Sequence, residues 1–204
     1  MFTLTIIDSD KWIAGGIAHY FRERSVKVKV IDEEQFEKAL TIAAGSDVVI
    51  SEIRTCHRDV QTFVELFFNL RKLLPAPRLI ILTDLEEEAV INYVTWRLPE
   101  ATVISKRTPS TQLAGEIFGG LILHGSKHSV QYPVENHGAL TAREFGLLRM
   151  LATKRTLTDI GQSLNLSVKT VSNHKRNIMR KLNCKKKNEL PTLLAKMGFT
   201  NSQF

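Results

Sequence analysis

Residues 167–182 read Ser167-Val-Lys-Thr-Val-Ser-Asn-His-Lys-Arg-Asn-Ile-Met-Arg-Lys-Leu182, and they decide how the last third of the chain folds. Apolar side chains recur here at steps of three, seven and four residues, at Val168, Val171, Ile178 and Leu182. These steps place all four on one face of an α-helix, which predicts a buried stripe. The opposite face carries basic and short polar side chains, a combination that fits the major groove of DNA.

Helix-start signals surround this segment. Thr141 and Glu144 have the spacing of a capping box, which predicts the start of an amphipathic helix. Thr156 can cap a short second helix, which a tight turn joins to the basic one. With a fourth helix after Asn188, residues 140–204 are predicted to form a small all-α four-helix domain that contains a helix-turn-helix.

Charge is distributed unevenly along the 204 residues, whose formal net charge is +7. Residues 137–204 hold 13 Lys and Arg against three acids, whereas residues 1–136 hold 15 against 18. The pattern favours a basic module for a polyanion, double-stranded DNA above all, attached to a near-neutral domain. On periodicity and charge alone, a helical bundle with a solvated charged face is the alternative.

The C-terminal segment closely resembles the LuxR/FixJ-type DNA-binding domain over about 50 residues, without gaps. The resemblance rests on Leu140-Thr-Ala-Arg-Glu144, Leu164-Asn-Leu-Ser-Val-Lys-Thr-Val171 and Asn177-Ile178. The stretch from Lys169 to Leu182 particularly resembles the RcsA/RcsB-like branch of enterobacterial regulators. The resemblance implies a domain that binds two-fold-related half-sites of DNA as a dimer.

The resemblance also implies which side chains contact DNA. The side chains expected to face the bases are Ser172, Asn173 and Arg176. Those expected at phosphates or at the groove edge are Lys169, Lys175, Lys181, Lys154 and Arg155. Lys154 stands where the family usually has a glycine after the first helix, so the local turn departs from the family pattern.

Residues 1–123 alternate short apolar runs with longer amphipathic segments. The expected strands are Leu4–Ile7, Val26–Ile31, Val48–Glu52, Leu79–Thr83 and Thr102–Ser105. Helices are expected at about 11–24, 33–44, 59–74, 85–96 and 110–123. This alternation predicts an α/β domain with a five-stranded, doubly wound parallel sheet. The second strand alternates lysine with valine, which suits the edge position that the order 2-1-3-4-5 gives it.

Residues 124–139 show neither period and are rich in turn formers, so they are expected to be a linker. The linker contains His124 and His128, four residues apart, with His137 further on, but no acid or cysteine is suitably spaced to complete a zinc site, so we expect no metal and no cofactor. We expect no enzyme either, because no nucleophile and base have a recognisable spacing. The chain lacks an apolar run long enough to cross a membrane and a signal peptide at its start, which favours the cytoplasm.

A doubly wound domain before such a module resembles the receiver of a response regulator. The resemblance implies an aspartate after the third strand that accepts phosphate and an acidic pair after the first strand that holds Mg²⁺. In this sequence Glu52 stands at the acceptor position. The acidic pair becomes Asp8-Ser9, with Asp10 one place late. Two further residues match the receiver, Thr83 its switch hydroxyl and Lys106 its lysine.

Glu52 is one methylene longer than the expected aspartate, and the metal pair has lost a carboxylate. We therefore expect no phosphorylation in the ordinary sense. Glu52 is expected either to reach Lys106 or Thr83 and hold the domain in one state, or to be merely a polar residue at a strand end.

The combined expectation is a DNA-binding transcription regulator with a degenerate receiver-like domain. It would act as a homodimer or as the auxiliary partner of an RcsB-like regulator. Two alternatives stay open, a regulator whose N-terminal domain senses a small molecule and an antagonist that binds other regulators but not DNA. Six apolar residues are a candidate interface or equally core residues: Val90, Tyr93, Val94, Trp96, Leu113 and Ile117.

Overall fold

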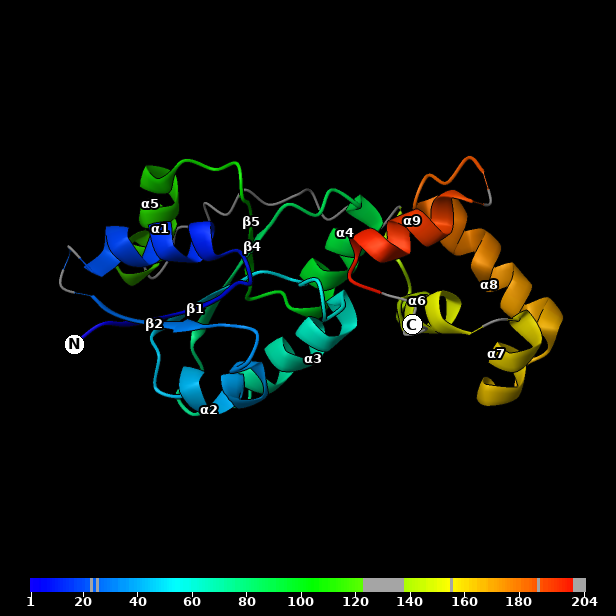
Figure 1. The fold of residues 1–204 in the computed structure, drawn as a ribbon, viewed down its shortest axis with the longest axis horizontal. Helices are drawn as coiled ribbons and strands as arrows, with labels where there is room; N and C mark the ends of the chain where they lie inside the picture. The colour runs from blue at the N-terminus through cyan, green and yellow to red at the C-terminus, as the bar shows by residue number, and fades with distance from the viewer. Residues whose placement is uncertain (23, 25, 123–137, 155, 187, 200–204) are drawn as a thin grey trace.

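A computed structural model describes residues 1–199 except 23, 25, 123–137, 155 and 187 (Figure 1). The first domain consists of β1 (Thr3–Ile7), α1 (Lys11–Arg22), β2 (Lys27–Ile31), a 3₁₀ turn (Phe36–Lys38), α2 (Ala39–Ala43), β3 (Val48–Ser51), α3 (Val60–Leu70), β4 (Arg78–Thr83), α4 (Glu88–Arg97), β5 (Thr102–Ser105) and α5 (Ser110–Ile122). The second consists of α6 (Ala142–Thr153), α7 (Leu157–Leu164), α8 (Val168–Lys181) and α9 (Glu189–Lys196).

The five strands form one parallel sheet in the order β2-β1-β3-β4-β5, which confirms the predicted topology. The central strands β1 and β3 are buried along their whole length, because helices cover both faces of the sheet. Figure 1 shows α1 and α5 on one side and α2 and α3 on the other. This arrangement brings the carboxyl ends of β1, β3, β4 and β5 to one edge, where the degenerate receiver residues lie.

Strand β2 lies at the edge of the sheet, as its alternating lysines predict. Lys27 and Val30 are exposed, while Ile31 is buried. The ammonium of Lys29 donates to the carbonyl of Ile42 at 2.7 Å, so this lysine also ties the edge strand to α2. The exposed lysine fits the way in which proteins discourage unwanted pairing at a sheet edge.

One predicted helix is much shorter than expected. The sequence predicts a helix over residues 33–44, but the structure has a 3₁₀ turn at Phe36–Lys38 followed by the five-residue α2. Before this turn, the carboxylate of Asp32 accepts a hydrogen bond from the amide of Gln35 at 3.0 Å. Local side-chain bonds of this kind compete with helix formation, which explains the late start.

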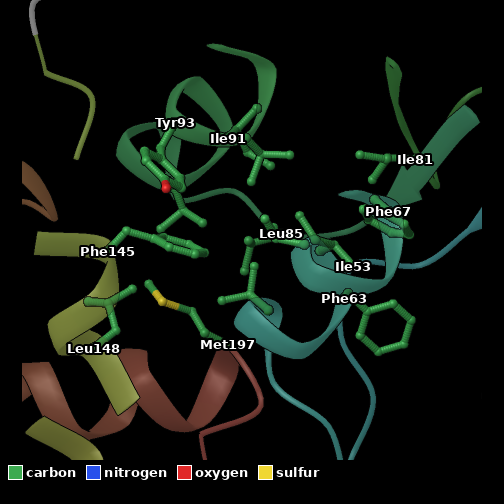
Figure 2. Packing of buried hydrophobic residues seen from close by; sticks show 14 of the residues in the cluster. Ile53, Phe63, Phe67, Ile81, Leu85, Ile91, Tyr93, Phe145, Leu148 and Met197 are labelled. Atoms are coloured by element: carbon green, nitrogen blue, oxygen red, sulfur yellow. The ribbon is translucent and has the colours of Figure 1, made fainter. Parts of the chain in front are cut away.

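The apolar core of the sheet domain continues into the helical domain. One cluster of buried side chains runs from α3 and α4 to α6, α8 and α9. Figure 2 shows Phe145 and Leu148 of α6, and Met197 after α9, facing Tyr93 and Leu85 of the first domain. The rings of Tyr93 and Phe145 stack with centroids 4.2 Å apart. The two domains therefore pack against one another directly.

This packing decides between the two interpretations of the six apolar residues expected at an interface or in the core. Val90, Tyr93 and Val94 are at most 6% exposed and belong to the cluster shared with the helical domain. Leu113 and Ile117, both on α5, are buried in the second cluster together with residues of α1 and of the sheet. Trp96 alone of the six is exposed, at 55%. Core packing therefore accounts for five of the six.

Candidate nucleic-acid interface

Two short helices joined by a tight turn form the helix-turn-helix. Helix α7 begins at a capping box formed by Thr156 and Asp159. The cap at Thr156 agrees with the prediction from the sequence, which did not include the role of Asp159. It ends at Asn165, whose φ of 56° lies in the left-handed region that asparagine tolerates. Ser167 then caps α8 by accepting a hydrogen bond from the amide of Thr170 at 3.0 Å. The start of α8 is thus fixed relative to α7.

Gly161 is a residue of this unit that the sequence reasoning missed. A Cβ at this position would lie 2.7 Å from the carbonyl oxygen of Leu166, too close for any other side chain. That same turn is closed by a hydrogen bond from the amide of Leu166 to the carbonyl of Gly161, at 2.8 Å. A lone glycine inside a capped helix was the available signal, because glycine is costly there without a packing reason.

Helix α8 presents most of the predicted base-contacting residues to solvent. Its buried side is formed by Val171 and Ile178, both 0% exposed. On the other side Lys169, Asn173 and Arg176 are exposed. Two further predicted contacts on this helix are half-buried, Ser172 and Lys175. Part of each residue is therefore accessible at the surface of the helix.

Val168 corrects the predicted buried stripe. Its spacing groups it with Val171, Ile178 and Leu182, but its side chain is 45% exposed. Val168 is the first residue of α8, and the nearest buried residue of the helix, Val171, lies almost one turn further along. Helical periodicity predicts the side of the helix on which a residue lies, but not whether a neighbouring segment extends far enough to cover it.

Lys181 does not extend from the exposed face of α8. Its ammonium lies 2.7 Å from the carboxylate of Glu144 and donates to the carbonyl of Ala139 at 2.8 Å. The lysine side chain is 15% exposed and the glutamate 4%. The geometry therefore makes Lys181 a buried link between α6 and α8, in place of the groove-edge contact that the family resemblance implies.

Glu144 is held as a carboxylate by its neighbours. It completes the predicted capping box, because it accepts from the amide of Thr141 at 2.8 Å while its own amide donates to the Thr141 hydroxyl. Burial works against its charge, but the bonds from Lys181 and from that amide outweigh it and lower the pKa of Glu144. One carboxylate thus starts α6 and anchors the end of α8.

The remaining predicted contacts lie around the end of α6. Lys154 is exposed and has an extended backbone, with φ −85° and ψ 139°, so the turn needs no glycine at this position. Arg155 lies outside the described residues. Asn177 is a further exposed polar residue of α8 that the sequence reasoning did not select. Its exposure depends on the helix rotation set by Val171 and Ile178, which a periodic pattern fixes only approximately.

At the carboxyl ends of the strands, Lys106 bridges the two acids of the degenerate receiver site. Its ammonium lies 2.8 Å from a carboxylate oxygen of Asp8 and 2.6 Å from one of Glu52. Glu52 also accepts a hydrogen bond from the amide of Ile53 at 2.7 Å, and the hydroxyl of Thr83 bonds to it. The structure therefore places Glu52 against both residues that it was expected to reach.

The other acid of this region has a different task. Asp10 caps α1, because its carboxylate accepts from the amides of Trp12 and Ile13 at 2.9 and 3.2 Å. Ser9 is exposed, whereas Asp8 is buried. Asp10 is thus committed to the helix start, and it does not replace the carboxylate that the position of Ser9 lacks.

Burial and ion pairing compete at this site. Burial raises the pKa of Glu52, although Lys106 acts in the opposite direction. For Lys106, burial favours the neutral amine, but Glu52 and Asp8 together outweigh it and raise its pKa. The raised pKa keeps the lysine charged, and its ammonium lies between the two carboxyl groups.

The loop between β3 and α3 connects this site to the helical domain. At its end, Asp59 caps α3 through the amide of Thr62 and receives two bonds from the guanidinium of Arg149, at 2.6 and 2.7 Å. Gly198, at φ 84°, passes so close that a Cβ would lie 2.6 Å from the carbonyl oxygen of Arg58. The side chain of Gln61 donates to the carbonyl of Phe145, which adds a third tie.

Two searches of the described residues concern metal ligands and membrane-spanning helices. In the part of the chain that the structure describes, no group of three or more His, Cys, Asp or Glu is arranged to hold a metal ion. The three histidines considered as ligands, His124, His128 and His137, lie outside that part. Of the helices described, none has the length and apolar character needed to span a membrane.

Comparison with known proteins links both domains to bacterial regulators. The family model "Bacterial regulatory proteins, luxR family" matches residues 138–202. The transcriptional regulatory protein LiaR of Bacillus subtilis is 24% identical over 198 residues, which cover 89% of this chain and 91% of LiaR. The uncharacterized response regulatory protein YgeK of Escherichia coli is 30% identical over 111 residues, which cover 54% of this chain and 74% of YgeK.

The solved structure of RcsB from Salmonella enterica serovar Typhimurium, bound to the promoter rprA, has a TM-score of 0.66 and 22% identity. It covers 96% of this chain, and the chain covers 99% of it. A second RcsB–DNA complex has a TM-score of 0.63 and 21% identity, with 95% and 98% covered. Both likenesses extend over the sheet domain and the helical domain together. The chain therefore belongs to the LuxR family of bacterial regulatory proteins, as a response-regulator-like, DNA-binding transcription regulator.

Proposed function

We propose that this regulator binds DNA through α8 without a phosphoryl switch. The observation that carries the proposal is the ammonium of Lys106, which bridges Asp8 and Glu52. In this arrangement the position of the acceptor is occupied by a longer carboxylate that is already paired. Ser9 supplies no second carboxylate for a metal ion, and phosphoryl transfer depends on such a charge balance.

Phosphate labelling tests the absence of the switch. The full chain is incubated with Mg²⁺ and a small phosphodonor, and an intact-mass measurement follows. We expect no acyl phosphate on the wild type, whereas the variant Ser9→Asp, Glu52→Asp restores the acidic pair and an acceptor and should gain label. A stable acyl phosphate on the wild-type chain would refute the proposal, and Glu52→Asp alone separates the acceptor from the metal pair.

For the DNA contacts, we propose two groups of residues. The residues proposed to read bases are Ser172, Asn173 and Arg176, and those proposed to bind phosphates are Lys169, Lys175, Lys154 and Arg155. The exposure of Lys169, Asn173 and Arg176 supports the proposal. Lys181 is not included, because Glu144 and Ala139 already bind its ammonium.

Affinity measured against salt concentration tests these contacts. Substituting Arg176 with alanine should weaken specific binding by about 1–3 kcal/mol, whereas Lys169→Ala should weaken all sequences alike and lower the salt slope by about one. Lys196→Ala on the exposed side of α9 is the matched control. Affinity that is absent, or that does not depend on salt, would instead favour the antagonist that pairs with other regulators and leaves DNA unbound.

We further propose that the regulator binds DNA as a dimer, by likeness to a solved structure in which two RcsB dimers are bound to two parallel DNAs. A two-fold arrangement would place one α8 in each half-site. Sedimentation of the chain with a palindromic and a half-site duplex distinguishes the two stoichiometries. Adding an RcsB-like regulator to the same experiment tests the auxiliary-partner alternative, which predicts a mixed complex.

A further inference from the structure

Val168 is an apolar side chain that the helix-turn-helix leaves uncovered. It is 45% exposed, whereas Val171, one turn along the same helix, is 0% exposed. The other large apolar side chains found exposed among the described residues all belong to the first domain: Met1, Trp12, Val30, Leu74 and Trp96. Val168 is therefore distinguished by lying on the very helix that carries the proposed base contacts.

The position of Val168 on α8 is well defined. Residues four apart on a helix lie one above the other, so Val168 lies in line with Ser172, and Ser172 with Arg176. The first turn is held by the bond from the Thr170 amide to the Ser167 hydroxyl, which also lies 2.8 Å from the Thr170 hydroxyl. Val168 thus extends the proposed base-facing row by one turn, toward the N-terminus of α8.

The chemistry of valine narrows what it can contact there. A valine side chain has no donor, so it cannot bind a phosphate oxygen, whereas its neighbour Lys169 can. In the major groove, the apolar feature of the base edges is the 5-methyl group of thymine. A β-branched side chain also has few rotamers in a helix, so little freedom is lost when it makes such a contact.

We propose that Val168 contacts the 5-methyl group of a thymine in the DNA half-site and thereby adds a specificity determinant to α8. The inference rests on the proposed function, because it requires that α8 enter the major groove. It predicts that this regulator distinguishes thymine from uracil at one position of each half-site.

Replacement of thymine by deoxyuridine tests the inference, because deoxyuridine pairs in the same way but lacks the methyl group. A duplex is first selected from a random-sequence library with the full chain, and each thymine of one half-site is then replaced in turn. We expect one replacement to weaken wild-type binding about fourfold, the effect of losing one buried methyl group. In Val168→Ala the same replacement should have no effect, as the double-mutant cycle requires.

Leu74→Ala, a change at an exposed leucine of the first domain, is the matched control and should keep the full sensitivity to deoxyuridine. Val168→Ala should also keep the unfolding temperature of the wild type, because the side chain is exposed. The inference is wrong if Val168→Ala remains as sensitive as the wild type, or if no replacement affects the wild type. If the library gives no duplex above background, the proposed DNA binding itself fails and the inference falls with it.

Discussion

Two regions of the molecule handle positive charge in opposite ways. At the carboxyl edge of the sheet, Lys106 lies between Asp8 and Glu52, both within 2.8 Å. On α8, Lys169 and Arg176 are exposed, and the described residues supply neither with an acidic partner. In the first region the counter-charges of the lysine are built in, as the proposed absence of a phosphoryl switch requires. The second is open, and the phosphates of DNA can supply the charge that it lacks.

Lys181 lies on α8, but its charge is paired with Glu144, as the charge of Lys106 is paired at the sheet. Breaking this ion pair is therefore the most severe test of the comparison. Glu144→Ala removes the carboxylate from a buried pair and also half of a capping box. We expect a loss of about 3 kcal/mol in the free energy of unfolding, because a buried charge is left unpaired. Denaturant unfolding followed by circular dichroism measures it.

The double variant Glu144→Ala, Lys181→Met is the control for that loss. Removing both charges should recover part of the stability, since the penalty comes from the unpaired lysine. A double variant as unstable as the sum of both single changes would show that the pair is not coupled.

Changing Gly161 should disturb the second region and leave the first intact. Gly161→Ala places a Cβ 2.7 Å from the carbonyl oxygen of Leu166, and we expect a loss of about 2 kcal/mol together with weaker DNA binding. Gly146→Ala, in α6 with nothing within 4 Å, should instead stabilise the chain by up to about 1 kcal/mol. Equal effects of the two changes would contradict the close approach in the helix-turn-helix.

A neutral side chain at position 52 should have a smaller effect than the loss of Glu144. Glu52→Gln removes a carboxylate whose pKa burial raises, while Asp8 continues to pair Lys106. We therefore expect the free energy of unfolding to stay within about 1 kcal/mol of the wild type, with DNA affinity unchanged. A loss as large as that of Glu144→Ala would show that Glu52 holds the domain together by itself.

The dependence of stability on pH gives the smallest expected effect. The pKa of Glu144 is lowered from its usual 4.5 in the folded chain. Its contribution to stability is therefore fully present above about pH 4.5 and is lost as the pH falls through the folded pKa. Unfolding curves of the wild type should show this loss, and those of Glu144→Gln should lack it. Identical dependence of stability on pH in the two proteins would mean that the partners of Glu144 do not lower its pKa.

Much of this structure could be predicted from local sequence patterns. The apolar runs of β1, β3 and β4 and the alternating lysines of β2 indicate which strands are buried on both faces and which lies at an edge, because such burial shows directly in the composition of a strand. The order of the strands follows from the doubly wound fold that the alternation of strands and helices predicts. The capping box of Thr141 and Glu144 and the helix start at Ser167 follow from side-chain chemistry within four residues. The degenerate receiver site could be located through the resemblance to a receiver, because the resemblance assigns its residues to the ends of particular strands.

What escaped prediction depends on contacts between distant segments. Lys181 has the appearance of a DNA contact until α6 brings Glu144 beside it, and the two are 37 residues apart. For Tyr93 the sequence leaves an interface and the core equally open, and the stacked ring of Phe145 decides for the core. The 45% exposure of Val168 likewise depends on which segments pack beside the first turn of α8, and the periodic pattern of α8 does not contain that information.

The shared apolar cluster limits how far the two domains can be exchanged as independent modules. In the full chain, Phe145 lies on Tyr93, and the bond between the Val60 amide and the Met197 carbonyl, at 3.0 Å, closes the seam. A fragment of residues 138–204 would expose Phe145 and Met197 to water, so it should self-associate unless these positions are made polar. Chimeras that join this helix-turn-helix to another receiver would need to carry the surface of α3 and α4 with it.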